Sequence, residues 1–316
     1  MLNYCLSRLG QLILMLFLAS VVIFAVIQNA PGDPALIRLG TEATPEQVEM
    51  ERVRLGLHRT LPERYAIWLG DAARLDFGKS FSTGLPVSET IADAFAQTLK
   101  LASLAALIGL VFGTALGITA ALNRGKWLDN AIAALTAAAF SLPSFALGTL
   151  LVIVFAVTLR WLPPSGLGNS SNTALDTLRF LIMPAVTLAM PFIVVLARYV
   201  RTSLIEALQQ DYVTTAKAKG LSRRTIVITH ALRNALIPTV TIAGLQIGNL
   251  LAGATVTETV FSYPGLGRLI IEAVTSLDYP LVQGALLFTA TVFLLCTFLV
   301  DLAYGLIDPR IRTAGG

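Results

Sequence analysis

The chain has 316 residues, of which 55% are hydrophobic and only 13% are charged, and its formal net charge at pH 7 is +4. Soluble domains carry about 25% charged residues, so the composition excludes a water-soluble globular protein and favours a polytopic membrane protein. The two cysteines, Cys5 and Cys296, lie at opposite ends of the chain. This excludes a disulfide framework, and a thiolate metal site is not expected.

Six apolar segments are long enough to cross a bilayer, which takes about 20 mostly apolar residues. We expect the first to remain uncleaved, because its apolar run is longer than that of a signal peptide and no small-residue cleavage site follows it. The sequence therefore predicts an all-α polytopic membrane protein with six transmembrane helices, at residues 9–28, 99–122, 130–158, 180–200, 236–257 and 281–306.

Lysine and arginine residues are concentrated in the 123–129 loop and the 198–235 segment, and they also flank both termini. Because short cytoplasmic loops collect positive charge, we expect these loops and both termini in the cytoplasm. The organisation that follows is a first transmembrane helix, an extracytoplasmic loop region and a five-helix core with a cytoplasmic loop. Their ranges are 1–29, about 30–97 and 98–316, with the loop at 201–235. The positive charge is thus explained without a nucleic-acid partner.

The spans carry small residues at helical spacing but few charges. Two successive Gly-x-x-x-Gly steps in the second span and one in the fifth predict close helix packing, at Gly109, Gly113, Gly117, Gly244 and Gly248. The centres of the spans lack charged residues, and Asp301 near the end of the sixth is the exception. Ion-coupled carriers usually contain intramembrane carboxylates, so this pattern argues against self-powered transport.

The outer loop region contains two predicted helices. Thr44-Pro45-Glu46-Gln47 indicates a helix start, with Thr44 as the N-cap and Gln47 closing a capping box. A second helix after Pro62 would have an apolar face formed by Tyr65, Trp68, Leu69 and Ala72. The region is too short and polar for an enzyme domain, and it fits a lid or a docking surface.

One motif in this region imitates a nucleotide site. Phe77-Gly78-Lys79-Ser80 looks like the end of a phosphate-binding loop, but Ala73 stands where that motif requires glycine, and no buried strand precedes it. We therefore expect no nucleotide, cofactor or metal bound by this chain, and no catalytic residues.

A segment with helix start and stop signals follows the fourth predicted span. Asp211 can cap a short helix, Lys217 and Lys219 fall in its last turn, Gly220 can end it, and Ser222 can cap the next helix. This layout fits a small helix that inserts into a groove of a partner. An ordinary basic cytoplasmic loop is the alternative, and it explains the charge but not the helix–glycine–helix layout.

The same segment carries a family resemblance. Residues 212–221, followed by 230–238, resemble the coupling-loop motif of ABC importer permeases, in particular the dipeptide, oligopeptide and nickel branch. Matches continue in order along the chain, at residues 31–34, 55–57, 76–80, 261–268, 278–280 and 308–310. Two departures occur, since Thr214-Thr215-Ala216 replaces the usual Glu-Ala-Ala, and residues 58–62 lack the usual Asp after Leu-Gly-Leu.

The resemblance implies a permease subunit of the cell inner membrane. Such a subunit forms half of a solute pathway and couples ATP hydrolysis by partner subunits to uptake of di- or oligopeptides or similar small solutes. The implied partners are a second homologous permease subunit, two ABC ATPase subunits or domains that bind ATP and Mg²⁺, and an extracytoplasmic solute-binding protein. Import of nickel or a metal chelate is the alternative. A self-contained secondary transporter or channel is a more distant alternative function, and so is a structural membrane protein.

The resemblance also assigns candidate residues. Contact with the ATPase subunit is expected from Asp211, Tyr212, Thr214, Thr215, Ala216, Lys217, Ala218, Lys219, Gly220, Leu221 and Ser222. An outer gate or a contact with the binding protein is expected from Trp68, Tyr263, Pro264 and Gly265. Neutral polar groups in or beside the spans are compatible with peptide backbones, namely Ser141, Ser144, Thr187, Gln246 and Thr257. The sequence leaves the substrate open.

Overall fold

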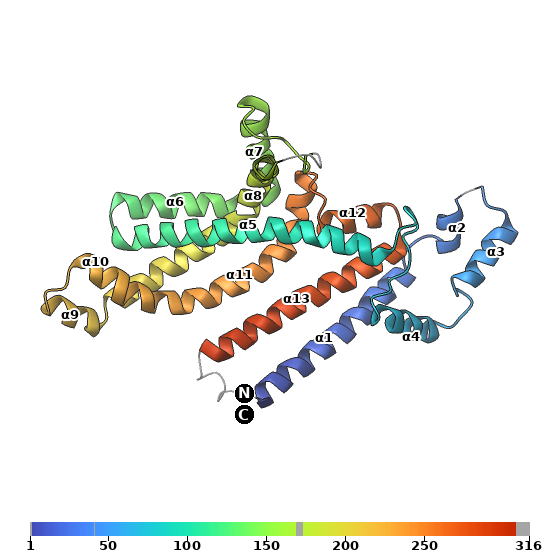
Figure 1. The fold of residues 1–316 in the computed structure, drawn as a ribbon, viewed down its shortest axis with the longest axis horizontal. Coiled ribbons are helices and arrows are strands. Elements are labelled where there is room, and N and C mark those ends of the chain that lie inside the picture. The colour runs from blue at the N-terminus through green and yellow to red at the C-terminus, as the bar shows by residue number, and fades with distance from the viewer. Residues whose placement is uncertain (1, 41, 169–172, 308–316) are drawn as a thin grey trace. The chain divides into compact units, whose positions relative to one another are not determined.

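The structure is a computed structural model, and it describes the backbone of residues 2–40, 42–168 and 173–307 (Figure 1). Within these ranges the regular elements are helices, and the extended pairing found is an isolated bridge between Lys79 and Pro86. The predicted all-α fold is therefore confirmed. The elements are α1 (Leu2–Gln28), α2 (Pro34–Leu39), α3 (Pro45–Arg54), α4 (Leu61–Ala72), α5 (Val87–Leu122), α6 (Trp127–Ser141), α7 (Ser144–Leu151), the π-helix η1 (Val152–Thr158), α8 (Ala174–Leu208), α9 (Asp211–Ala218), α10 (Arg223–Thr225), the π-helix η2 (Ile226–Leu232), α11 (Arg233–Val260), α12 (Leu266–Thr275) and α13 (Tyr279–Ile307).

Among the described residues, four helices are long and apolar enough to cross a membrane. They agree with the first, second, fourth and sixth predicted spans, and they cover Leu6–Gln28, Val87–Leu122, Leu175–Leu208 and Tyr279–Val300. A bent pair, Trp127–Ser141 with Ser144–Thr158, raises the number to five if it is one span. Helix α11 covers the fifth predicted segment but is not among these candidates. The chain is polytopic, while the count of six stays a prediction.

The third predicted span is not one straight helix. The prediction of a continuous helix over 130–158 is wrong in shape, because the axis turns by 103° between α6 and α7. Pro143 has no backbone N–H and disfavours helical backbone at the residue before it. Leu142 accordingly takes ψ 126°, in the extended region, and α7 begins at Ser144.

Two compact units are distinguished by their internal contacts. The first comprises Met1–Gln97 and Pro264–Phe298, and the second comprises Thr98–Tyr263 and Leu299–Gly316. The first unit thus groups the predicted outer loop region with α1, α12 and most of α13. The second holds the remaining transmembrane helices and the predicted cytoplasmic loop.

The core of the second unit is built on α8, whose most extensive contacts are with α11. Helix α5 also approaches α8 closely, because a Cβ placed on Gly113 or Gly117 would lie only 2.9 Å from Leu196 Cβ or 2.6 Å from Val200 Cβ. The packing role predicted for these glycines is confirmed. Gly248 of α11, in contrast, has no atom within 4 Å of such a Cβ. Helix α8 also contains two internal prolines, Pro184 and Pro191.

In the first unit, α4 packs on α1 through aromatic side chains. The ring centroids of Tyr65 and Trp68 lie 5.3 and 5.7 Å from that of Phe24, and the Tyr65 hydroxyl lies 2.8 Å from the hydroxyl of Ser20. The predicted apolar face of α4 therefore covers α1. The predicted capping box of α3 is also present, because Thr44 Oγ1 accepts from Gln47 N–H and Gln47 Oε1 accepts from Thr44 N–H.

Candidate functional site

Helix α9 is a short helix with defined ends. Its last turn closes in a Schellman arrangement, in which Leu221 N–H donates to Ala216 O at 3.2 Å and Gly220 N–H donates to Lys217 O at 3.0 Å. Gly220 has φ +77°, the left-handed conformation that favours glycine, as predicted. The expectation that Asp211 caps the helix is wrong by one residue. Gln210 is the N-cap, and Asp211 is the first helical residue, where its charge still favours the helix dipole.

The turn after Gly220 leads directly into the next helix. Ser222 is the N-cap of α10, as predicted, and its hydroxyl accepts a hydrogen bond from Thr225 N–H at 3.2 Å. The residues between the two helices are therefore fixed by local hydrogen bonds at both ends. This holds α9 in one orientation relative to α10.

One face of α9 is covered by the chain itself. Val213 is fully buried, Ala216 is 6% exposed, and both pack against Ile226 of η2. They lie three residues apart and hence on the same side of the helix. Ala216 is therefore an internal packing residue here, whereas its expected place was on the surface facing a partner. The exposed candidates are Asp211, Tyr212, Thr214, Thr215, Lys217, Ala218, Lys219, Gly220, Leu221 and Ser222.

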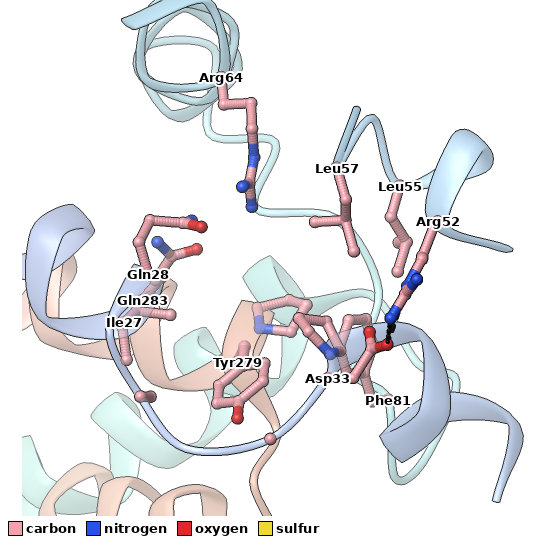
Figure 2. A pocket seen from close by; sticks show the side chains of 14 residues that line it. Ile27, Gln28, Asp33, Arg52, Leu55, Leu57, Arg64, Phe81, Tyr279 and Gln283 are labelled. Carbon is pink, nitrogen blue, oxygen red and sulfur yellow. Dashed lines mark hydrogen bonds and ion pairs between the residues drawn. The ribbon is translucent and has the colours of Figure 1, made fainter. Parts of the chain in front are cut away.

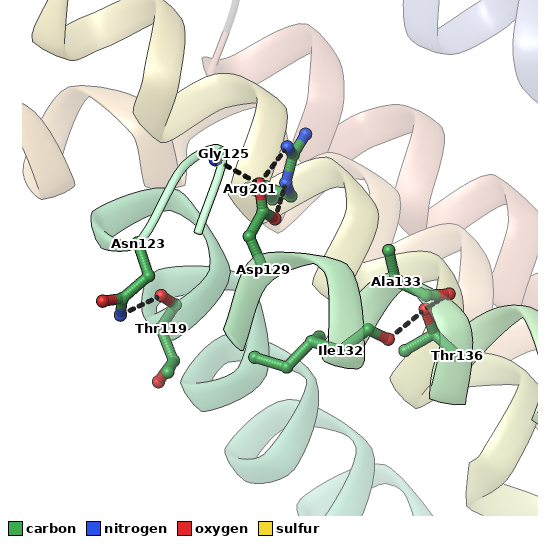
Figure 3. Close-up of polar contacts among 8 residues, drawn as sticks. All are labelled: Thr119, Asn123, Gly125, Asp129, Ile132, Ala133, Thr136 and Arg201. Carbon is green, nitrogen blue, oxygen red and sulfur yellow. Dashed lines mark hydrogen bonds and ion pairs between the residues drawn. The ribbon is translucent and has the colours of Figure 1, made fainter. Parts of the chain in front are cut away.

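An ion pair joins the first turn of α6 to α8 within the same unit. Figure 3 shows Arg201 reaching Asp129, with both Nε–Oδ1 and Nη2–Oδ2 distances at 2.7 Å. Asp129 is buried, and its Oδ2 also accepts from Gly125 N–H at 2.9 Å. A bidentate guanidinium–carboxylate pair is strong and directional. Sequence reasoning treated Arg201 as a topological charge only, and it missed this contact.

A small cavity lies in the second unit where α7, α8 and α11 meet, and we call it the polar cavity after the polar residues in its wall, although most of that wall is apolar. It has a volume of about 110 Å³, and its wall includes four of the five neutral polar residues singled out in the sequence, namely Ser144, Thr187, Gln246 and Thr257, together with Asn249. Ser141 is not part of it. The Thr257 hydroxyl is buried without a hydrogen-bond partner among the described residues. Buried hydroxyls are rarely left unpaired, so this one lacks a partner that such groups normally have.

Glu258 is a buried carboxylate that the sequence scan missed. Its side chain is fully buried, and the hydroxyl of Thr98 donates to its Oε1 at 2.6 Å. Tyr263 is also fully buried, in the core of the second unit. A buried tyrosine does not fit direct contact with a docking protein, and its role in a gate stays a prediction.

The other outer candidates lie in the first unit. Pro264 and Gly265 border a cavity of about 350 Å³ whose wall also includes Asp93, Gln97 and Arg268. Trp68 does not line this cavity, since its ring lies against Phe24 and Tyr65. The structure therefore separates Trp68 from the Pro264–Gly265 turn.

A loop of the first unit is held by one carboxylate. Asp278 accepts hydrogen bonds from the Ser80 hydroxyl at 2.5 Å and from the Ser82 hydroxyl and N–H at 2.9 and 3.1 Å. Burial of Asp278 raises its pKa, but the bonds from Ser80, Phe81 and Ser82 outweigh burial, and the pKa is lowered below its usual value. Asp278 therefore stays ionised and anchors residues 80–82.

Two family models cover almost the whole chain. Residues 113–313 match the binding-protein-dependent transport system inner membrane component, and residues 1–102 match the N-terminal domain of the same component. The chain therefore belongs to the family of binding-protein-dependent transport system inner membrane components. It is an ABC transporter permease and a multi-pass protein of the cell inner membrane.

Curated relatives share the full length of the chain. It is 40% identical to the di/tripeptide transport system permease protein DppB of Pseudomonas aeruginosa (strain UCBPP-PA14), over 99% of both chains. It is 41% identical to the glutathione transport system permease protein GsiC of Escherichia coli K12, again over 99% of both chains. These relatives are transport permease components rather than enzymes.

Solved structures show the same fold at low sequence identity. An inward-facing structure of the MetNI methionine ABC transporter aligns with a TM-score of 0.54 and 19% identity, over 69% of this chain and 96% of that one. An amino acid ABC transporter aligns with a TM-score of 0.51 and 16% identity, over 68% and 92% of the two chains. The fold is thus shared with ABC transporter permeases.

Proposed function

We propose that the chain is one of two membrane subunits of an ATP-driven importer for small peptides, including glutathione-like peptides. The names of the full-length relatives support this substrate class. Import of a metal chelate is the second candidate, since the neutral polar cavity would also accept a chelate. In this proposal the chain has six spans with cytoplasmic termini. Partner ATPase subunits bind ATP and Mg²⁺, and an extracytoplasmic binding protein delivers the solute.

The observation that carries the coupling role is the exposure and rigid mounting of α9. Its inner face, Val213 and Ala216, is held by Ile226, and its C-terminal end is closed by the Gly220 turn. The opposite face, with Asp211, Thr215 and Ala218, is free for a partner. Helix α8 reaches α9 through only Gln209 and Gln210, so force on α9 passes directly to a membrane helix.

The polar cavity near Thr187 and Thr257 is proposed as this subunit's share of the solute pathway. Its volume of about 110 Å³ is below the 300–1,000 Å³ typical of small-molecule sites, so it suits half of a site completed by the second permease subunit. Hydroxyl and amide groups there would exchange hydrogen bonds with the peptide groups of a passing solute. Ligand-dependent closure of the ATPase subunits would shift the bundle between two states.

The test uses two glycines in similar backbone conformations. Gly220 and Gly125 have φ +77° and +75°, and a Cβ on either would meet no atom within 4 Å. Valine at each position therefore imposes backbone strain of about 1 kcal/mol or more, with no clash at Cβ. Gly220→Val should abolish co-purification of the ATPase subunit or solute-stimulated ATP hydrolysis in nanodiscs, and Gly125→Val should preserve both. If the Gly220→Val variant and a separate Tyr212→Ala variant both keep full coupling, the role of α9 is refuted.

A further inference from the structure

The first unit contains a cavity of about 520 Å³, and none of its lining residues belongs to α9 or lines the polar cavity of the second unit. It is bordered by the end of α1, the start of α2, the end of α3, α4, and the start of α13 (Figure 2). This volume falls within the range of 300–1,000 Å³ that holds small organic ligands. Apolar side chains, among them Ile27, Leu55 and Leu57, form part of its wall.

Two of the charged residues in the wall neutralise each other. Asp33 Oδ2 accepts from Arg52 Nη2 at 2.6 Å and from Arg52 Nε at 2.9 Å, and Asp33 Oδ1 accepts from Ala35 N–H. Burial raises the pKa of Asp33, but the Arg52 and backbone hydrogen bonds outweigh it and lower that pKa. Asp33 therefore remains an anion committed to Arg52.

Arg64 supplies the remaining charge. Figure 2 shows its side chain extending from α4 into the cavity, on the side where Gln28 and Gln283 lie. No ion pair to Arg64 is found among the described residues, and burial alone lowers its pKa. A guanidinium partly removed from water without a counter-charge is costly, unless an anion occupies the space in front of it. The cavity thus has a net positive charge on one side.

The Gln283 side chain gives an independent sign of a missing ligand. It is 8% exposed, and its Nε2 is buried without a hydrogen-bond partner among the described residues. Buried amides in native structures are nearly always hydrogen-bonded, so the unpaired amide of this cavity-lining residue indicates a missing partner. Gln28 offers a second amide at the same wall.

We propose that this cavity binds the carboxylate of a small organic solute, such as a peptide with a free C-terminus. Arg64 is the charge partner, and the amides of Gln283 and Gln28 donate hydrogen bonds to the same ligand. A planar guanidinium matches a carboxylate in two parallel hydrogen bonds. The apolar wall suits the organic part of the solute, and the single uncompensated charge suits a monoanion. The site is independent of α9, so it can be tested without any ATPase subunit.

The experiment measures binding to the full-length chain in nanodiscs by titration calorimetry. The probe is the dipeptide Ala-Ala, and its C-terminal amide is the matched control ligand. Ala-Ala should bind, and the amide should bind at least tenfold more weakly because it lacks the carboxylate. Equal affinity for the two ligands, or no binding of Ala-Ala, would overturn the proposal.

Variants locate the site and separate it from other sources of binding. Arg64→Gln should weaken Ala-Ala binding at least tenfold, whereas Arg74→Gln, which removes an exposed charge outside the cavity, should leave it unchanged. Gln283→Leu should weaken binding several-fold without lowering the melting temperature, because it removes an unpaired amide. Unchanged binding in Arg64→Gln overturns the proposal. The proposal is also overturned if the Arg64→Gln chain binds Ala-Ala normally but no longer binds the solute-binding protein. Arg64 would then pair with a carboxylate of that protein instead of one on the solute.

Discussion

The hydroxyl of Ser80 donates a hydrogen bond of 2.5 Å to the carboxylate of Asp278, although 198 positions separate the two residues in the chain. Asp278 is fully buried and also accepts two hydrogen bonds from Ser82. The contact joins the loop before α5 to the turn between α12 and α13 within the first unit. The loop whose sequence looks like a phosphate-binding loop is therefore held in place by a structural contact. We call this contact of Asp278 with Ser80 and Ser82 the clasp.

Removing this charge should loosen the loop. Asp278→Asn places an amide N–H₂ against donors, so we expect a loss of stability of about 2–4 kcal/mol. The loss should appear as a lower melting temperature and faster proteolysis between residues 78 and 86. Asp71→Asn, at an exposed carboxylate of the same unit, is the control and should change neither. Equal proteolysis of the two variants would contradict the clasp.

The clasp should also depend on pH in one direction. The pKa of folded Asp278 lies below its ordinary value of 3.8, so the stabilisation from this carboxylate is present above pH 3.8 and is lost as the pH falls through the lower folded pKa. Loop proteolysis by an acid-active protease should therefore rise below about pH 4 in the natural chain. In Asp278→Asn this particular rise should be absent, and a rise of the same size in both proteins would count against Asp278 as its cause.

Glycines with the same sequence spacing should differ in their tolerance of alanine. A Cβ on Gly117 would lie 2.6 Å from Val200 Cβ and 2.7 Å from Ala197 O, so Gly117→Ala should destabilise the second unit by about 1–3 kcal/mol. Gly248→Ala meets no atom within 4 Å and should be neutral within this chain. Melting temperatures in detergent give the comparison, and similar losses for both would argue against close packing of α5 on α8.

The pair of Asp129 and Arg201 should contribute measurably to stability. Asp129→Asn leaves the guanidinium without its bidentate partner, and we expect a loss of about 1–3 kcal/mol because Arg201 is partly exposed. Lys126→Gln removes an exposed charge directly before α6 and is the control. Thermal unfolding measures both. A loss in Lys126→Gln as large as that in Asp129→Asn would assign the effect to local charge alone.

The proposed topology predicts labelling from opposite sides of the membrane. In a chain without Cys5 and Cys296, Glu46→Cys should react with an impermeant maleimide in intact spheroplasts. Ser222→Cys should react only after the membrane is opened. Both positions are exposed in the structure, so burial does not explain a difference. Labelling of both from one side would refute the six-span arrangement with cytoplasmic termini.

Local patterns were readable from the sequence, and distant pairings were not. The Thr44–Gln47 capping box and the Gly220 turn were predicted because each is completed within a few residues. Asp129 and Arg201 lie 72 positions apart, and nothing in the sequence indicates that these two charges meet. Ala216 was misplaced for a related reason, because its partner Ile226 lies on another helix.

Two further differences come from how apolar segments are read. An average over residues 130–158 is apolar throughout and conceals Pro143, whose backbone restriction turns the axis by 103°. Glu258 lies one residue beyond the predicted end of the fifth span, so the scan for charges inside spans passed over it. Gly117 and Gly248 share the Gly-x-x-x-Gly motif, but only the position of a neighbouring helix decides whether the motif packs closely against another helix.

The two prolines inside α8 give this helix a mechanical property. Pro184 and Pro191 are seven residues apart, so both missing N–H groups fall on nearly the same side of the helix, where bending is easiest. From Pro191 to the end of α8 at Leu208 the helix extends about 26 Å. A tilt of about 5° at Pro191 would then carry α9 through roughly 2 Å, in a direction set by the prolines. Helix α8 would thus amplify motion. A small change of angle inside the membrane would produce a displacement of α9 large enough to alter its contacts with a partner.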